Sequence, residues 1–320
     1  ELGGSARYNY SDRDATSINY SERFLKGAEG SSFSNSNSKN RNKNMNFNAD
    51  FRLEWKPDTL TNIIFRPNLS YGKSEGASVS ESGTFNQDPF NFATNPNDYL
   101  NLKWLEEHPD EDPLQGRVNT SNNQSLSEGN SLSANASLQV NRRLNDKGRN
   151  ITFRGTFGYG NNDNEQFTDY QTYYYDKDRD DIRKQYITSP TKNYDYTAQL
   201  TYSEPIARAT FLQFSYRFQY KHSESDKSTY SLIPEDEKEQ DWLWELGDNL
   251  PERYKENFVD SLSKNAKYDY YNHEINAGLR FIREKYQLNI GASLQPQNTR
   301  LAYRKEEIDT VVKRSVFNFS

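Results

Sequence analysis

The chain has 320 residues and a mass of 37.4 kDa, enough for one large domain or two of average size. Hydrophobic residues make up only 32% of it but aromatic residues 14%, which argues against a conventional aliphatic core and also against disorder. The absence of cysteine excludes disulfides, thiolate metal sites and a cysteine nucleophile, and the net charge of −6 gives no reason to expect a nucleic-acid partner.

Strict alternation of apolar and polar residues is the dominant pattern, and it predicts antiparallel strands joined as hairpins. Over 45–56 the apolar residues take the odd positions, and after a turn the alternation resumes over 63–71. In chain order the pattern predicts ten strands, the last incomplete, at 6–10, 45–55, 63–71, 132–140, 151–159, 194–202, 212–220, 271–281, 286–294 and from 317. Short turns are predicted at 57–61, 145–149, 204–207 and 283–285.

The length of the apolar runs predicts a membrane protein. The runs at 63–71, 151–159, 194–202 and 212–220 each span nine residues, and the run at 271–281 spans eleven. A tilted strand needs about 9–11 residues to cross the hydrocarbon layer. Aromatic residues end these runs, as in the two girdles of outer-membrane barrels. A soluble sandwich would explain the alternation but not the constant run length, and the irregular turn spacing argues against a solenoid.

We therefore predict an all-β fold, an antiparallel transmembrane β-barrel in the bacterial outer membrane, in contact with outer-membrane lipid. Short turns on one side and long loops on the other match the topology of such barrels, with the turns periplasmic. The long segments at 86–128, 165–190 and 230–264 are the predicted extracellular loops.

Charged residues on the predicted inner face are the first candidate site. They would line a water-filled lumen, or they would dock a plug domain or mark a solute path. These residues are Arg7, Arg52, Glu54, Arg66, Arg154, Arg217, Glu274 and Arg280. Arg52, Glu54 and Arg66 flank one turn and could pair across that hairpin.

Tryptophans in the predicted loops are the second candidate site. Trp104, Trp242 and Trp244 lie beside acidic residues, so they could stack on a ligand or form the small core of a long loop. The acidic run at 176–181 lacks the glycine and glutamate of an EF-hand, and we find no phosphate loop, catalytic triad or paired metal-ligand motif. We therefore expect no metal, no cofactor and no catalytic residues, so the chain is not expected to be an enzyme.

One family resemblance rests on the segments 51–58, 61–67 and 70–72, together with 31–36 and 83–86. They resemble the large outer-membrane β-barrel family of Bacteroidota, which is similar to TonB-dependent receptors. The resemblance implies a barrel of about 22 strands, with a plug domain ahead of it in the same chain. We expect both ends of the chain to lie within a larger protein, so that 1–320 is the N-terminal portion of the barrel.

The implied function is uptake of a scarce solute, such as a metal chelate or an oligosaccharide, through a plugged barrel. The implied partners are the plug, an inner-membrane TonB complex and a surface lipoprotein. The alternative is a barrel that transports nothing and displays its loops for adhesion or complex assembly. A loop-borne hydrolase is a third reading, but nothing in the sequence aims the loop carboxylates at a substrate.

Overall fold

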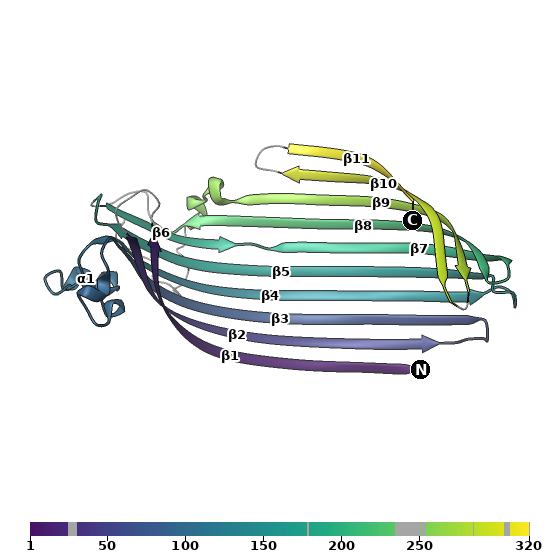
Figure 1. Ribbon diagram of the computed structural model, residues 1–320, viewed down its shortest axis with the longest axis horizontal. Helices are drawn as coiled ribbons and strands as arrows, with labels where there is room; N and C mark the ends of the chain where they lie inside the picture. Colours follow the sequence, from purple (N-terminus) through teal and green to yellow (C-terminus); the bar gives the residue numbers. More distant parts are fainter. Residues whose placement is uncertain are drawn as a thin grey trace.

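Eleven antiparallel strands form one sheet in the computed structural model, which describes residues 1–24, 31–177, 179–233, 250, 254–283, 285–303 and 308–319 (Figure 1). The strands are β1 (Leu2–Phe24), β2 (Ser31–Trp55), β3 (Thr61–Phe85), β4 (Arg117–Arg143), β5 (Asn150–Tyr174), β6 (Arg179–Thr188), β7 (Thr191–Ala207), β8 (Thr210–Ser231), β9 (Lys264–Ile282), β10 (Gln287–Tyr303) and β11 (Ile308–Phe319). The short helices are η1 (Pro89–Asn91), η2 (Pro96–Tyr99), α1 (Leu102–Glu107), η4 (Tyr254–Asn257) and η5 (Asp260–Leu262).

The strand that the sequence did not predict, β6, continues the course of β7. Thr188 of β6 lies opposite Glu165 of β5, and Thr191 of β7 lies opposite Asn162, so one register runs through both strands. Pro190 interrupts the course because proline has no N–H to give to the ladder. We count β6 and β7 as one course, meaning one continuous line of strand across the sheet, so the eleven strands make ten courses, the number of strands predicted.

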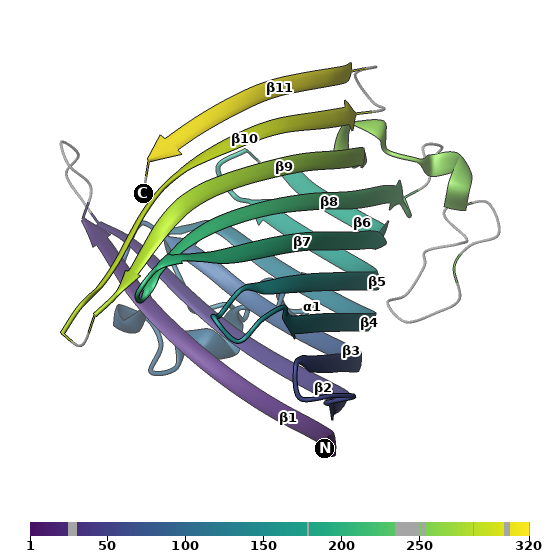
Figure 2. The ribbon, with the colours of Figure 1, turned by 90° about the vertical axis from the view of Figure 1, so that its right-hand side faces the viewer.

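The sheet is curved and open. Figure 2 shows the strands following one another in one curved layer from β1 to β11. Among the described strands, β1 and β11 stand at the two ends of the order and do not pair with each other. A closed barrel of 22 strands stays a prediction.

One face of the sheet carries the exposed apolar side chains. Strand register places Phe47 opposite Tyr71 and Tyr71 opposite Leu132, so these side chains share that face. Their exposed fractions are 37%, 38% and 38%, and Ile275, on the same face of β9, is 51% exposed. We call this region of the face the apolar band. A row of large apolar side chains open to the surroundings suits contact with lipid.

The buried core lies on the same face but nearer the loop end of the strands. One cluster joins Phe85, Leu100 and Leu114, and the second joins Tyr186 and Leu232. Phe92 and Tyr99 pack against the first cluster, and the described residues Leu250 and Tyr254 pack against the second. Among the described residues, no helix is long and apolar enough to cross a membrane.

The strands extend further into two predicted loops than the sequence suggested. β4 already begins at Arg117, inside the predicted loop 86–128, and β5 and β6 occupy most of 165–190. These extensions are rich in Ser, Asn, Thr and charged residues, so they lack the apolar run from which strands were predicted. Pairing with neighbouring strands satisfies their backbone groups instead.

The turn predicted at 204–207 is also displaced. β7 continues to Ala207, and the chain reverses at Arg208 and Ala209, where Ala209 has a φ of 51°. Pro205 marks an irregularity in the pairing with β8, a role that proline takes at strand ends as well as in turns. The other predicted turns fall between the strands expected, and Gly148 supplies the left-handed conformation (φ 99°) in the turn after β4.

Candidate functional site

All eight charged residues predicted for the inner face lie on the face opposite the apolar band. Arg7 is opposite Asn48, Arg66 is opposite Ser137, and Arg280 is opposite Asn289. On each strand these residues occupy the positions that alternate with those of the apolar band, so their side chains point to the other face. We call this side of the sheet the polar face. Its role as a lumen or plug-docking surface stays a prediction.

The structure brings four of these residues into one row across the polar face. The four residues are Glu54, Arg154, Arg217 and Glu274. Each lies on a different strand, and directly opposite residues on neighbouring strands connect them in the order Glu54, Ile64, Gln139, Arg154, Gln199, Arg217 and Glu274. Arg217 lies 3.6 Å from Glu274, and glutamine amides separate Arg154 from its neighbours in the row. Such a row can hold an anionic or hydroxyl-bearing group at several points at once.

The pairing predicted across the first hairpin takes a different form. Arg52 contacts Glu54 on its own strand at 2.9 Å, and Lys56 contacts the same carboxylate at 3.3 Å. The two residues of β2 on the same face are close enough to pair because side chains two positions apart point in one direction.

Uncharged hydrogen-bonding groups cover most of the rest of the polar face. One register row reads Asn48, Ser70, Ser133, Gly160 and Asn193 across five strands. Neighbouring strands are also linked through their side chains: Ser78 to Ser125 at 3.3 Å, Ser121 to Thr172 at 2.7 Å, Thr152 to Asn141 at 3.0 Å and Asn276 to Ser215 at 3.1 Å. The face therefore offers amides and hydroxyls to whatever lies against it.

The segment between β3 and β4 builds the second candidate site, at the loop end of the sheet. Asp88 caps η1 by accepting a hydrogen bond from the Phe90 amide at 3.0 Å, and Asn101 caps α1 by accepting one from the Trp104 amide at 2.9 Å. Asn97 and Asn35 form a buried amide pair at 3.1 Å that ties the segment to β2. These contacts hold α1 against the strand extensions (Figure 1).

A buried ion pair fixes the return of this segment to the sheet. The Asp112 carboxylate accepts hydrogen bonds from Arg117 Nε at 2.7 Å and Nη2 at 2.9 Å, and the Arg117 side chain is only 5% exposed. Arg117 Nη2 also donates to the Tyr99 carbonyl at 2.6 Å, and the guanidinium lies 5.3 Å from the centre of the Phe85 ring. The Arg117 guanidinium therefore contacts a carboxylate, a backbone carbonyl and an aromatic ring at the same time.

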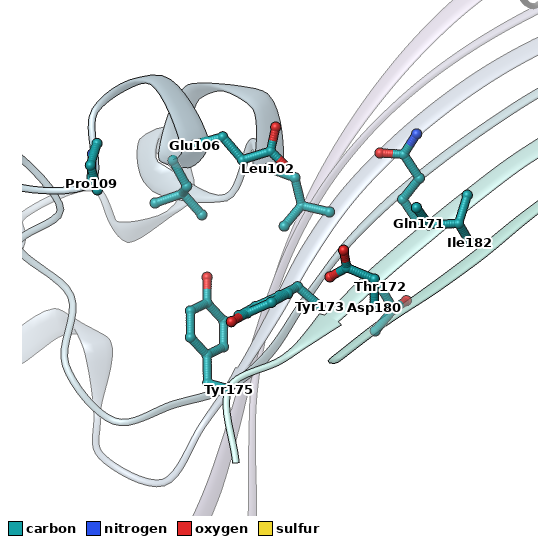
Figure 3. A pocket seen from close by; sticks show the side chains of 10 residues that line it. Leu102, Glu106, Pro109, Gln171, Thr172, Tyr173, Tyr175, Asp180 and Ile182 are labelled. Carbon is teal, nitrogen blue, oxygen red and sulfur yellow. The ribbon is translucent and has the colours of Figure 1, made fainter. Parts of the chain in front are cut away.

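A pocket of about 390 Å³ lies between α1 and the β5–β6 hairpin. Figure 3 shows Leu102 and Glu106 of α1 on one side and Tyr173 and Tyr175 on the other. Asp180 adds a carboxylate on the β6 side. The remaining lining residues are Leu105, Pro109, Gln171, Thr172 and Ile182.

The pocket suits a ligand with an apolar or ring-shaped body and hydroxyl or amino groups. Tyr173 and Tyr175 meet edge to face at 4.7 Å, which gives a rigid aromatic wall. Glu106 and Asp180 can accept hydrogen bonds or attract a positive charge. Among the described residues, no group of three or more His, Asp or Glu is arranged to hold a metal ion.

Trp104 lies beside this pocket but does not line it. Its ring stacks on His108 at 5.1 Å and meets Tyr99 edge to face at 5.5 Å, contacts that stabilise the segment. Trp242 and Trp244 lie outside the described residues. Ligand contact by the three tryptophans stays a prediction.

The sequence did not single out the tyrosines and Asp180 that line the pocket. The run of tyrosines from Tyr170 to Tyr175 was a signal for an aromatic surface, but it lay in a segment expected to be a loop. Only the pairing of β5 with β6 shows which of these rings share a face with Asp180 and Ile182.

No protein-family model and no curated protein matches this chain. Solved structures with some similarity include the outer membrane protease OmpT from Escherichia coli, which is 12% identical, with 99% of this chain and 92% of that chain covered and a TM-score of 0.28. The copper transporter OprC is 9% identical over 99% of this chain, with a TM-score of 0.17. The siderophore receptor PirA from Acinetobacter baumannii is 7% identical over 99% of this chain, with a TM-score of 0.16. This chain spans 62% of the length of each of the last two.

The chain is a bacterial outer-membrane protein, as its strand pattern predicts. The prediction that it is not an enzyme is contradicted, because the first of these structures is an outer membrane protease. That prediction assumed that a barrel pattern without a catalytic motif excludes catalysis, and a protease built on an outer-membrane fold removes this assumption. A TM-score of 0.28 transfers no catalytic residue to this chain, so no reaction is assigned.

Proposed function

We propose that this chain forms part of the wall of an outer-membrane transporter that takes up a scarce solute. The observation that carries the proposal is the contrast between the two faces of one sheet. At the height where Phe47, Tyr71 and Leu132 are exposed to lipid, the opposite face presents Asn48, Ser70 and Ser133. A polar wall at membrane depth needs water or a polar partner against it.

The width of the sheet supports a large interior. About eight strands close into a barrel whose interior is just filled by side chains, whereas larger barrels hold a channel or a plug. This sheet has ten courses, and its described end strands β1 and β11 do not pair with each other, so we propose that further strands complete the barrel. The interior of such a barrel has room for a solute path or for the plug that the family resemblance implies.

The chemistry of the polar face favours an oligosaccharide over a metal chelate. Amides and hydroxyls such as Asn48 and Ser133 both donate and accept hydrogen bonds, which matches the many hydroxyl groups of a sugar. The row from Arg154 to Glu274 adds both charge signs at separate points. By the resemblance, energy for uptake would come from a TonB complex, and a surface lipoprotein would assist capture.

Uptake by cells tests the proposal. We would express the full-length protein in a strain lacking its gene and follow labelled maltohexaose and a ferric catecholate chelate, with and without a protonophore. We expect uptake of the oligosaccharide that the protonophore abolishes. In the double variant Asn48→Leu/Ser133→Leu, uptake should fall by about tenfold or more if two hydrogen bonds of about 1 kcal/mol each are lost.

A matched control separates transport from folding. The double variant Phe47→Leu/Leu132→Ile changes the same strands at the same height on the lipid face, and it should transport like the unmodified protein. Equal loss in both variants, or no protonophore-sensitive uptake of either solute by the unmodified protein, would overturn the proposal.

A surface barrel for adhesion is the second candidate, and the position of the pocket favours it. Tyr173 and Ile182 lie on the outward side of the strand extensions, in register with the face that carries the apolar band, and not on the polar face. A ligand held there is displayed beside the barrel. Binding of a ligand by cells without protonophore-sensitive entry would support this candidate over transport.

A further inference from the structure

A hollow with both charge signs lies on the outward side of the sheet, just beyond the apolar band. It has a volume of about 430 Å³ and is lined on this side by Arg41, Lys43, Glu75, Glu128, Glu165 and Phe167. We call it the head hollow. Register confirms that Lys43, Glu75, Glu128 and Glu165 are direct neighbours across four strands.

The charges of the head hollow are separated by strand. The lining cations Arg41 and Lys43 stand on β2, and three carboxylates follow one another on β3, β4 and β5. Arg41 also holds Asp12 of β1 through two hydrogen bonds of 3.0 Å and 2.7 Å, and Lys43 lies 3.7 Å from Glu75, so an incoming phosphate shares both cations with carboxylates. Like charges directly opposite on paired strands repel. Lys73 relieves part of this repulsion, because its ammonium lies 3.0 Å from Glu75 and 2.9 Å from Glu128 and lowers the pKa of Glu75. Arg41 and Glu128 are each 54% exposed, Lys43 is 39% exposed, and Glu165 is also exposed, so an incoming group can reach these four side chains.

An apolar groove lies below the head hollow on the same strands. Its volume is about 730 Å³, within the range of small-molecule sites, and it is lined on the lipid-facing side by Ala6, Ala49, Pro67, Leu69, Ala134 and Phe157. We call it the tail groove. It lies near the centre of the apolar band, where only lipid or a membrane partner can fill it.

The spacing of the two features matches one leaflet of a membrane. Pro67 in the groove and Lys73 beside the head hollow are on the same face of β3, six residues apart. At about 3.4 Å per residue they are about 20 Å apart along the strand, which a tilt of about 45° reduces to about 14 Å along the membrane normal. Half of a hydrocarbon layer of about 30 Å is about 15 Å.

We propose that the head hollow and the tail groove together bind one lipid whose head carries both a phosphate and a primary amine. The phosphate contacts Arg41 and Lys43, the amine contacts Glu128 and Glu165, and an acyl chain fills the tail groove. The charge pattern selects this head. A purely anionic head meets three glutamates, and a quaternary amine has no N–H to donate to them. The site is independent of the solute that the protein transports.

Native mass spectrometry of the full-length protein, purified in detergent, tests the proposal. The probes are phosphatidylethanolamine, phosphatidylcholine and phosphatidylglycerol with identical acyl chains. We expect the ethanolamine lipid to bind about fivefold more tightly than the other two, since an exposed ion pair contributes up to about 1 kcal/mol. Equal affinity for the three lipids would overturn the proposal.

Variants place the lipid in the proposed site. Glu128→Gln/Glu165→Gln should abolish the preference for the ethanolamine lipid, and Ala134→Phe, which fills the tail groove, should weaken binding of all three. The matched controls are Glu224→Gln, in a Glu224–Lys267 pair on the same face of β8 and β9, and Ala277→Phe, on the lipid face of β9. A selective loss in the controls and none in the site variants would show that the lipid binds elsewhere and would reject this site.

Discussion

Two regions on the same face of the sheet differ in how far their apolar side chains are exposed: those in the apolar band are exposed, and those of the two clusters at the loop end are buried. On β3, Leu69 in the apolar band is 42% exposed, whereas Phe85 at the loop end is 0% exposed, although both point to the same side of the sheet. The same contrast separates Phe157 of β5, 49% exposed, from Tyr186 of β6, 5% exposed. At these two loop-end positions the chain buries a large apolar side chain that would otherwise meet water.

This difference identifies the surroundings of the apolar band. If the whole face met water, the exposed residues of the band would carry an unmet cost of roughly 25 cal/mol for each Å² of apolar surface. At the loop end, Leu100 and Leu114 pack over Phe85 and remove that cost. In the band, lipid covers the side chains and no protein segment is needed.

The largest expected effect is at Phe85. Phe85→Ala leaves a cavity in a fully buried cluster and should destabilise the 86–116 segment by about 3–5 kcal/mol, which raises its local opening by about 100-fold or more. Limited proteolysis of the protein in vesicles measures this opening. Phe157→Ala, which exposes no cavity to water, should leave the cleavage rate of the segment unchanged. Similar rates for both variants would contradict the contrast.

Loss of the buried Arg117–Asp112 ion pair should have the second-largest effect on the stability of the 86–116 segment. Asp112→Asn removes the negative partner of Arg117, and loss of one partner of a buried pair costs about 3 kcal/mol. The same proteolysis assay should show faster cleavage within 86–116. The control is Asp309→Asn, which breaks the exposed Arg300–Asp309 pair and should behave like the unmodified protein.

An arginine in the apolar band should give the next effect. Leu69→Arg places a charge near the middle of the membrane and should lower the free energy of unfolding by about 2–4 kcal/mol. Val79→Arg, ten positions further along the same face and 40% exposed, should change it by less than about 0.5 kcal/mol. Guanidinium unfolding in lipid vesicles measures both, and equal losses would place Val79 in lipid or Leu69 in water.

The smallest effect is the pH response of the turn between β2 and β3. The Asp58 carboxylate accepts hydrogen bonds from the Leu60 amide at 2.8 Å and from Thr61 Oγ1 at 3.1 Å, and both lower its pKa. A lowered pKa in the folded state contributes stability above the unfolded value of about 3.9, and this stability is lost as pH falls through the folded pKa. Asp58→Asn should flatten the acid limb of the unfolding curve below about pH 4, and between pH 8 and pH 9 it should lower stability by an amount that does not vary with pH.

The sequence determined the strands in the band, their phase and the two faces. A period of two residues is a local property, so the positions of Phe47 and Asn48 on opposite faces followed without a structure. The eight charged residues of the polar face were likewise assigned by phase alone. Turn chemistry located three of the four tight turns, and the fourth failed because Pro205 fits a strand irregularity as well as a turn.

Only the tertiary structure decided which side chains of different strands are neighbours. The row that joins Arg154 to Glu274 depends on the register of four strands, and the pocket depends on α1 packing against β5 and β6. Neither is encoded by spacing along the chain, because register arises from pairing between residues that are far apart in the sequence, as with Thr61 and Arg142. Alternation fixes the face of each side chain locally, whereas its neighbours are fixed by contacts between distant strands.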